Sequence, residues 1–141
     1  IPGTGDVENI KNLAQQLLDN PNVTYPYTDS MGVNVRQVLE GVAKTGKGLV
    51  NSPDVDFDEV AVSERMLQAL VEYAKTNKIG LNALTNADHS SNSNHYKGIA
   101  VDIACTPALN RSVFETIAAK YGGTNNGEVC PDDRHWHYDF R

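Results

Sequence analysis

Apolar residues recur every three or four positions in four segments of the chain, which is the spacing of one face of a helix. These segments are residues 7–18, 35–44, 63–78 and 111–120. Asp6 and Ser63 stand where the N-caps of the first and third segments are expected. Gly46 and Gly48 follow the second segment and end it. The pattern therefore predicts four amphipathic helices.

The pattern changes after Lys78, where apolar and polar residues begin to alternate as in half-buried strands. Strands are predicted over residues 79–85, over 99–101, near Val129 after a turn at 122–127, and over 135–140. Residues 1–5 are expected to form a flexible tail, and residues 19–32 and 86–94 to form loops. Since helices come first and short strands later, we expect an α+β fold with a small antiparallel sheet packed against helices.

The terminal segment 135–140 carries the clearest alternation. His135, His137 and Asp139 would share one face of this strand, while Trp136, Tyr138 and Phe140 would face the core. The last strand therefore presents two histidines and a carboxylate together.

The chain has 141 residues, 40% of them hydrophobic, which suffices for one hydrophobic core. We expect a helical extension over residues 1–58 and a core over residues 59–141, together forming one compact domain. Because the chain begins at Ile1 rather than Met, we expect it to be one module of a larger protein. We also expect a monomer.

Charge and hydropathy argue against a nucleic-acid partner and against a membrane span. Twelve Lys and Arg stand against eighteen Asp and Glu, a formal net charge of −6. This balance disfavours a nucleic-acid partner, because no surplus of positive charge can neutralise phosphates. No apolar run approaches the roughly 18 to 20 residues that a membrane span needs, so none is expected.

The two cysteines, Cys105 and Cys130, form no CxxC pair. They fit either one disulfide in an oxidising compartment or two unrelated buried thiols.

All four histidines, His89, His95, His135 and His137, lie in the last 53 residues. Catalytic zinc sites use three protein ligands, usually His and a carboxylate, and keep a fourth position for water. His95, Asp102, His135 and His137 could supply such ligands if the strands that carry Asp102 and the last two histidines are neighbours. Taken singly, each of these residues could equally be an ordinary surface or hydrogen-bonded core residue.

A longer motif favours the zinc interpretation. The run from Ser93 to Asp102 matches S-x-H-x-x-G-x-A-x-D, and His135-Trp136-His137 supplies a following H-x-H. This combination resembles the Hedgehog/zinc D-Ala-D-Ala peptidase superfamily, over about residues 60 to 141. The stretch from His89 to Ile103 is most similar to the Hedgehog version.

The resemblance implies a role for each matching residue. His95, Asp102 and His137 would bind Zn²⁺, with His135 beside the metal. His89 matches a histidine that lies near the zinc in Hedgehog-like members. His89 and His135 would then orient the substrate carbonyl or stabilise the oxyanion.

The catalytic base is where the chain departs from the family pattern. Family members place a Glu or Asp three residues before the second histidine ligand, or a Glu six residues before it, and these positions are Arg134 and Pro131 here. Asp132 and Asp133 lie close by. We expect Asp133 to be the base, with a solvated turn as the alternative role for both aspartates.

The resemblance implies a zinc metallopeptidase that hydrolyses peptide bonds of bacterial peptidoglycan, as a D,D-carboxypeptidase or endopeptidase. Such a cell-wall lysin module would be secreted or phage-borne and act outside the cell or in the cell wall on a stem peptide or cross-bridge. The alternative is a Hedgehog-like zinc-binding module that recognises a partner or ligand without peptidase turnover, as the missing Glu suggests.

Overall fold

The computed structural model describes residues 5–141, and the first four residues of the expected tail lie outside them. The helices are α1 (Val7–Asp19), α2 (Val35–Thr45), α3 (Glu64–Ala74), the short 3₁₀ helix η1 (Asn94–Lys97) and α4 (Arg111–Lys120). The strands are β1 (Val23–Thr24), β2 (Lys47–Leu49), β3 (Glu59–Ala61), β4 (Ile79–Ala83), β5 (Ala100–Ala104), β6 (Gly123–Asn125) and β7 (His135–Phe140).

Five strands form the main sheet in the order β1-β4-β5-β7-β6. All neighbours in it are antiparallel except β1 and β4, which are parallel. β2 and β3 form a separate antiparallel pair. The predicted α+β class is therefore confirmed, as is a mostly antiparallel sheet packed against helices.

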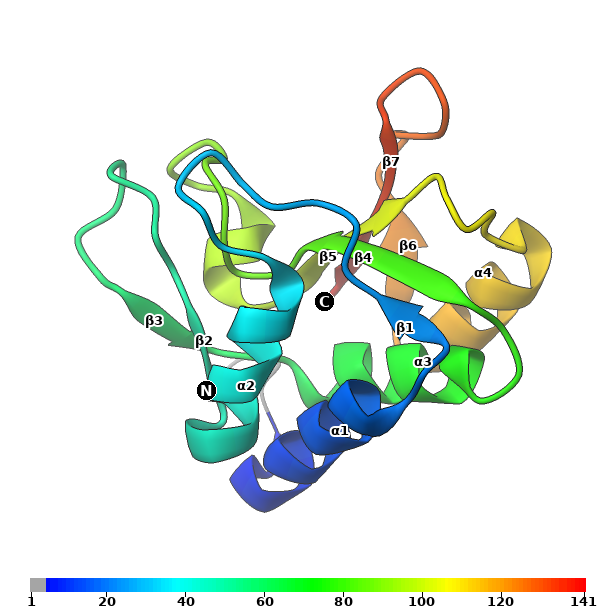
Figure 1. The fold of residues 1–141 in the computed structure, drawn as a ribbon, viewed down its shortest axis with the longest axis horizontal. Coiled ribbons are helices and arrows are strands. Elements are labelled where there is room, and N and C mark those ends of the chain that lie inside the picture. Colours follow the sequence, from blue (N-terminus) through cyan, green and yellow to red (C-terminus); the bar gives the residue numbers. More distant parts are fainter. Residues whose placement is uncertain (1–4) are drawn as a thin grey trace.

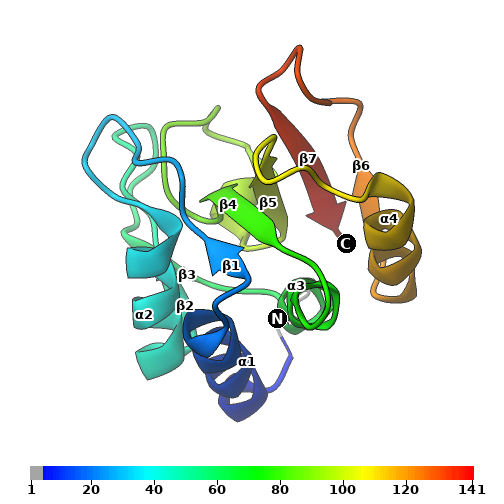
Figure 2. The same ribbon diagram turned by 45° about the vertical axis from the view of Figure 1, so that its right-hand side comes forward.

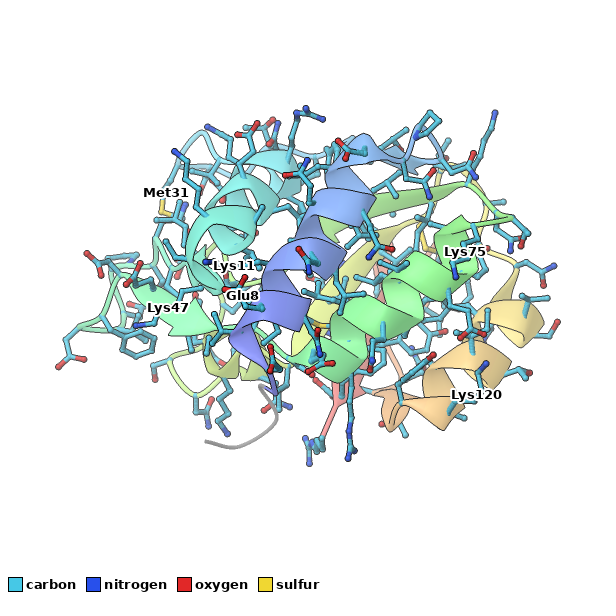
Figure 3. The ribbon with its side chains drawn as sticks, turned by 90° about the horizontal axis from the view of Figure 1, so that it is seen from below. Glu8, Lys11, Met31, Lys47, Lys75 and Lys120 are labelled. Atoms are coloured by element: carbon cyan, nitrogen blue, oxygen red, sulfur yellow. A yellow bond between two sulfur atoms is a disulfide. The ribbon has the colours of Figure 1, made fainter. Side chains whose placement is uncertain are left out.

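Helices α1, α2 and α3 lie beneath the sheet, and α4 continues this layer beside the edge strand β6 (Figure 1). Seen from below, α2, α1, α3 and α4 lie side by side across this layer (Figure 3). α3 is almost end-on below the sheet in Figure 2, with α4 beside β6. The opposite side of the sheet is left to loops, and these loops surround the candidate site.

Helix ends follow the sequence signals closely. The Asp6 side chain accepts a hydrogen bond from the backbone N–H of Asn9, and that of Ser63 accepts one from Met66, as N-caps do. Gly46 ends α2 at φ 80°, in the left-handed region that glycine adopts without strain. These caps confirm the predicted starts of α1 and α3 and the end of α2.

The third helix is shorter than predicted, since it ends at Ala74 rather than near Lys78. Side chains donate hydrogen bonds to the carbonyl groups at its end. Asn77 donates to the Tyr73 carbonyl, and Asn20 and Asn22 both donate to the Ala74 carbonyl. These bonds satisfy the end of the helix without further turns.

The strand predicted near Val129 is wrong, and the predicted turn at 122–127 instead contains β6. Gly123 of β6 pairs with Phe140, and a Cβ at Gly123 would lie only 2.4 Å from the Phe140 ring. A side chain at this position would force the buried Phe140 ring to move. Val129 lies in a turn in which its N–H donates to the Asp133 carboxylate. The sequence also gave no sign of the strands β1, β2 and β3.

One hydrophobic core joins the two segments that the sequence separates at residue 58. Buried residues of α1 and α2 pack in the same cluster as α3, α4 and the inner sides of β5 and β7; they include Ile10, Leu17, Leu39, Leu67, Ile103, Phe114 and Tyr138. Burying each such side chain contributes about 1.5 to 3 kcal/mol. The extension therefore packs as part of the body that carries the site.

The two cysteines form a disulfide, Cys105–Cys130, rather than two separate thiols. It ties the chain just after β5 to the turn before β7, the two strands that carry the site. Within residues 5–141, no helix is both long and apolar enough to cross a membrane.

Candidate metal centre

Asp102 and His137 face each other across neighbouring strands. In the antiparallel pairing of β5 with β7, Asp102 is directly opposite His137, and Ala104 is opposite His135. Trp136, like Tyr138, turns toward the core cluster. The alternation predicted for the last strand is thus observed, and it places both histidines beside Asp102.

His95 reaches the same place from the short helix η1. The Ser93 hydroxyl accepts from the His95 N–H and begins this turn, and Gly98 ends it at φ 74°. A Cβ on Gly98 would lie 1.9 Å from the Ala61 carbonyl oxygen. A glycine is therefore required both by the backbone conformation and by the close approach of β3.

The two nitrogens of the buried His95 ring have different surroundings. Nδ1 lies at hydrogen-bond distance from the Leu84 carbonyl. Since a carbonyl only accepts, Nδ1 carries a proton, and in the neutral ring Nε2 then holds the lone pair. Nε2 lies 3.3 Å from Asp102 Oδ1 and is a buried atom without a hydrogen-bond partner. In that neutral form, two electron-rich atoms face each other inside the protein.

His137 has a carboxylate at each ring nitrogen. Its Nδ1 is 2.9 Å from Asp102 Oδ1, and its Nε2 is 2.8 Å from Asp139 Oδ1. Burial acts to lower the pKa of His137, but the bonds to Asp102 and Asp139 outweigh burial and raise that pKa to about 10. His137 is therefore a cation in the ion-free protein, and Asp139 fixes its orientation.

Asp102 is the point where these contacts meet. Burial acts to raise the pKa of its carboxyl, but the hydrogen bond from His137 and the surrounding imidazoles hold it well below its usual range. Its Oδ1 lies 3.3 Å from His95 Nε2, 2.9 Å from His137 Nδ1 and 3.8 Å from His135 Nε2. Ring nitrogens of His95, His137 and His135 thus lie near one carboxylate oxygen. His137, however, is in neither of the two groups whose ligand atoms all lie within 4.8 Å of one another.

His89 belongs to the same cluster. Its ring stacks on that of His95, with centroids 3.8 Å apart, and His89, His95 and Asp102 each offer a ligand atom within 4.8 Å of the others. Its Nε2 lies 3.0 Å from the Asn86 carbonyl, so that nitrogen holds the proton. Burial and the neighbouring His95 lower the pKa of His89 to about 4. The neutral ring is placed to accept or to ligate rather than to donate to an oxyanion.

Glu128 is a site residue that sequence reasoning missed. Its Oε1 lies 2.6 Å from His135 Nε2, and Asp102, Glu128 and His135 form a second group whose ligand atoms lie within 4.8 Å of one another. Burial acts to raise the pKa of Glu128, but hydrogen bonds from His135 and Asn126 lower it. This side chain is therefore ionised at neutral pH. It lies nine residues before His137 in a loop, where no periodicity or family spacing marks it.

Asp133, the base expected from the sequence, lines the same cleft but is engaged elsewhere. Its Oδ2 accepts from the Val129 N–H at 2.8 Å, and its own N–H donates to the Val129 carbonyl. Neither of the two groups around Asp102 includes Asp133. Its neighbour Asp132 is exposed in the same turn.

These side chains lie in an open cleft of about 1170 Å³. Tyr27, Asp29 and Ser30, from the loop between β1 and α2, line it together with the loops that carry His89 and Glu128. This loop lies on the side of the sheet away from the helical layer (Figure 1). The N-terminal segment therefore supplies part of the cleft wall.

A hydrogen-bond network links this wall to the histidines. The Asp29 carboxylate is buried and accepts from the side chains of Asn86 at 2.9 Å and Asn51 at 3.2 Å, and from the N–H groups of Met31 and Val33. Asn86 in turn accepts from the Leu84 N–H and offers its carbonyl to His89. Asp29 thus holds the loop that orients two histidines.

Comparisons with protein-family models, with curated protein sequences and with solved structures found no match to this chain. The site has to be interpreted from its own geometry. That geometry is a buried group of His and Asp side chains that could hold a metal ion.

Proposed function

We propose that the protein is a zinc-dependent peptidase that hydrolyses peptide bonds of bacterial peptidoglycan. One observation carries the metal part of this proposal, namely the unpartnered Nε2 of His95 facing Asp102. A buried lone pair that points at a carboxylate is costly unless a cation lies between them.

The donor set fits zinc. His95 and His137 each have one ring nitrogen fixed, by Leu84 and Asp139, and the other directed at Asp102. Metal-binding histidines commonly donate their second N–H to a carbonyl or carboxylate in this way. Two imidazoles and one carboxylate are a common ligand set of catalytic zinc. When bound, zinc would lower the pKa of a water and polarise the carbonyl that is attacked.

Glu128 and His135 are the cleft residues proposed to take part in proton transfer. Glu128 Oε1 is ionised, half-exposed and next to His135, so it can accept a proton from a water in the cleft. His135 Nε2 lies 2.6 Å from Glu128 Oε1 and holds this carboxylate in place. Glu128 is favoured over Asp133 as the base, because Glu128 and not Asp133 belongs to the group of ligand atoms around Asp102 and His135.

The substrate class rests on the motif shared with the Hedgehog/zinc D-Ala-D-Ala peptidase superfamily, and the open cleft supports it by having room for a peptide. The disulfide Cys105–Cys130 is in keeping with an oxidising compartment, so we propose that the protein acts outside the cell or in the cell wall.

Turnover of purified peptidoglycan tests the proposal. The zinc-loaded protein should release new amino groups from the wall peptides, lose this activity on chelation and regain it with zinc. Glu128→Gln should lower the rate by about 10²- to 10⁴-fold while the ion stays bound. Asp133→Asn is the matched comparison and should cost less than about tenfold. A zinc-bound protein that releases no amino groups from any wall preparation would refute the peptidase proposal.

His89 favours a second candidate function, a zinc-binding module without turnover. Structural zinc sites have four protein ligands, whereas catalytic sites leave one position open. His89, within 4.8 Å of His95 and Asp102, could be the fourth ligand. His89→Ala separates the two functions. In a peptidase this variant should keep its zinc affinity, and in a closed binding module it should lose most of it.

A further inference from the structure

A second set of possible ligand atoms lies beside the first and shares Asp102 with it. Asp102, Glu128 and His135 each offer a ligand atom, all within 4.8 Å of one another. The distances are 2.6 Å between Glu128 Oε1 and His135 Nε2, and 3.8 Å between His135 Nε2 and Asp102 Oδ1. One imidazole and two carboxylates at these separations can surround a divalent cation after small side-chain movements.

The loop that carries Glu128 is fixed by its own contacts. Asn126 donates to Glu128 Oε2 at 2.9 Å, which leaves Oε1 directed at His135. The Asn125 side chain donates to the carbonyl groups of both Glu128 and His137, at 2.9 and 3.0 Å. The Glu128 carboxylate is therefore held against β7 before any ion arrives, which lowers the cost of ordering it on binding.

Solvent access distinguishes this second group from the first. The side chains of Glu128 and His135 are 43% and 26% exposed, whereas those of His95 and Asp102 are 2% and 9% exposed. An ion at the second group would keep several waters among its ligands. It would also share the charge of Asp102 with any ion bound to His95. Both effects make the second group the weaker of the two.

We propose that Glu128, His135 and Asp102 form a second divalent-cation site, which fills after the first and inhibits the enzyme. The inhibition rests on the proposed function, because an ion bound to Glu128 takes away the carboxylate that accepts the proton. The binding itself does not depend on turnover. Asp102 would be a ligand common to both sites, and hydrolases with two neighbouring metal ions are known.

Calorimetric titration of the folded protein with Zn²⁺, with metal content measured in parallel, tests the site. The wild-type protein should show two binding events, the weaker one complete below about 1 mM. Glu128→Gln and His135→Gln should each weaken the second event at least about tenfold and leave the first in place. Asp132→Asn, which removes an exposed carboxylate from the neighbouring turn, is the control and should keep both events.

A single event in the wild type, or a second event that persists unchanged in either folded variant, overturns the proposal. Circular dichroism establishes that each variant is folded; if one is not, the other decides. His95→Ala separates this result from the proposed function, because it removes the tight event alone. If the wild-type protein shows both zinc-binding events but no peptidase activity, the peptidase proposal is refuted and the second cation site is still supported.

Discussion

His95 Nε2 lies 3.3 Å from Asp102 Oδ1, and this buried nitrogen makes no hydrogen bond. Nδ1 is directed at the Leu84 carbonyl and carries a proton, so in the neutral ring the contact sets the Nε2 lone pair against a carboxylate. In the protein interior such an arrangement costs free energy unless positive charge is added. A bound metal ion supplies that charge, and the following predictions depend on this arrangement.

Asp139 should control the affinity for the metal without touching it. Asp139→Ala removes the acceptor for His137 Nε2 and should weaken zinc binding by about 10- to 100-fold. Asp139→Asn keeps an oxygen there and should lie between this variant and the wild type. Competition against a chelator of known affinity measures the effect. Equal affinity in all three proteins would mean that His137 is not a ligand.

Gly98 should be among the least replaceable glycines of the chain. Gly98→Ala places a Cβ 1.9 Å from the Ala61 carbonyl oxygen at φ 74°, and should lower the free energy of unfolding by about 2 to 4 kcal/mol. Gly32→Ala is the matched control. Gly32 has φ 85° but open space around it, so this variant should lose only about 1 kcal/mol. Urea denaturation of both variants gives the comparison, and similar losses would contradict the close approach at Gly98.

Asp29 should stabilise the cleft wall in a pH-dependent way. Burial acts to raise its pKa, but hydrogen bonds from Val33, Asn86, Asn51 and Met31 lower the pKa below its usual range. Because the folded-state pKa is the lower one, the contribution is complete above about pH 4, the unfolded value, and is lost as pH falls through the folded value.

Asp29→Asn should therefore lower the free energy of unfolding by about 2 to 3 kcal/mol at pH 7, and by progressively less below about pH 4. Denaturant titrations across this range measure the difference from the wild type. Asp56→Asn, on the exposed 51–58 loop, should change stability by less than about 0.5 kcal/mol throughout. A difference at Asp29 that does not depend on pH would exclude its carboxylate as the source.

Local patterns in the sequence predicted the parts of the site that lie within single elements. Period-two alternation placed His135 and His137 on one face of β7, and the motif from Ser93 to Asp102 joined η1 to β5. Helical periodicity located all four α-helices, since their buried faces are continuous. These features depend on residues that are close together along the chain, so they can be recognised in a single sequence.

The features that the sequence did not predict depend on contacts between distant residues. Glu128 reaches His135 because β6 pairs with β7 through Gly123 and Phe140, a close approach that no local pattern reports. Asp29 binds Asn86 across 57 positions of the chain. The choice between Asp133, expected from the sequence, and Glu128, proposed from the structure, stays a prediction for the variants to decide.

A crystal structure of the zinc-loaded protein, with anomalous scattering at the zinc edge, tests the central claim most directly. At one ion per chain, the zinc should lie within about 2.0 to 2.2 Å of His95 Nε2, an Asp102 oxygen and His137 Nδ1, with one position left open. His95 Nε2, which has no hydrogen-bond partner in the structure, should be bound to the ion. An ion bound elsewhere, or no ion at His95 in the presence of excess zinc, would contradict the account.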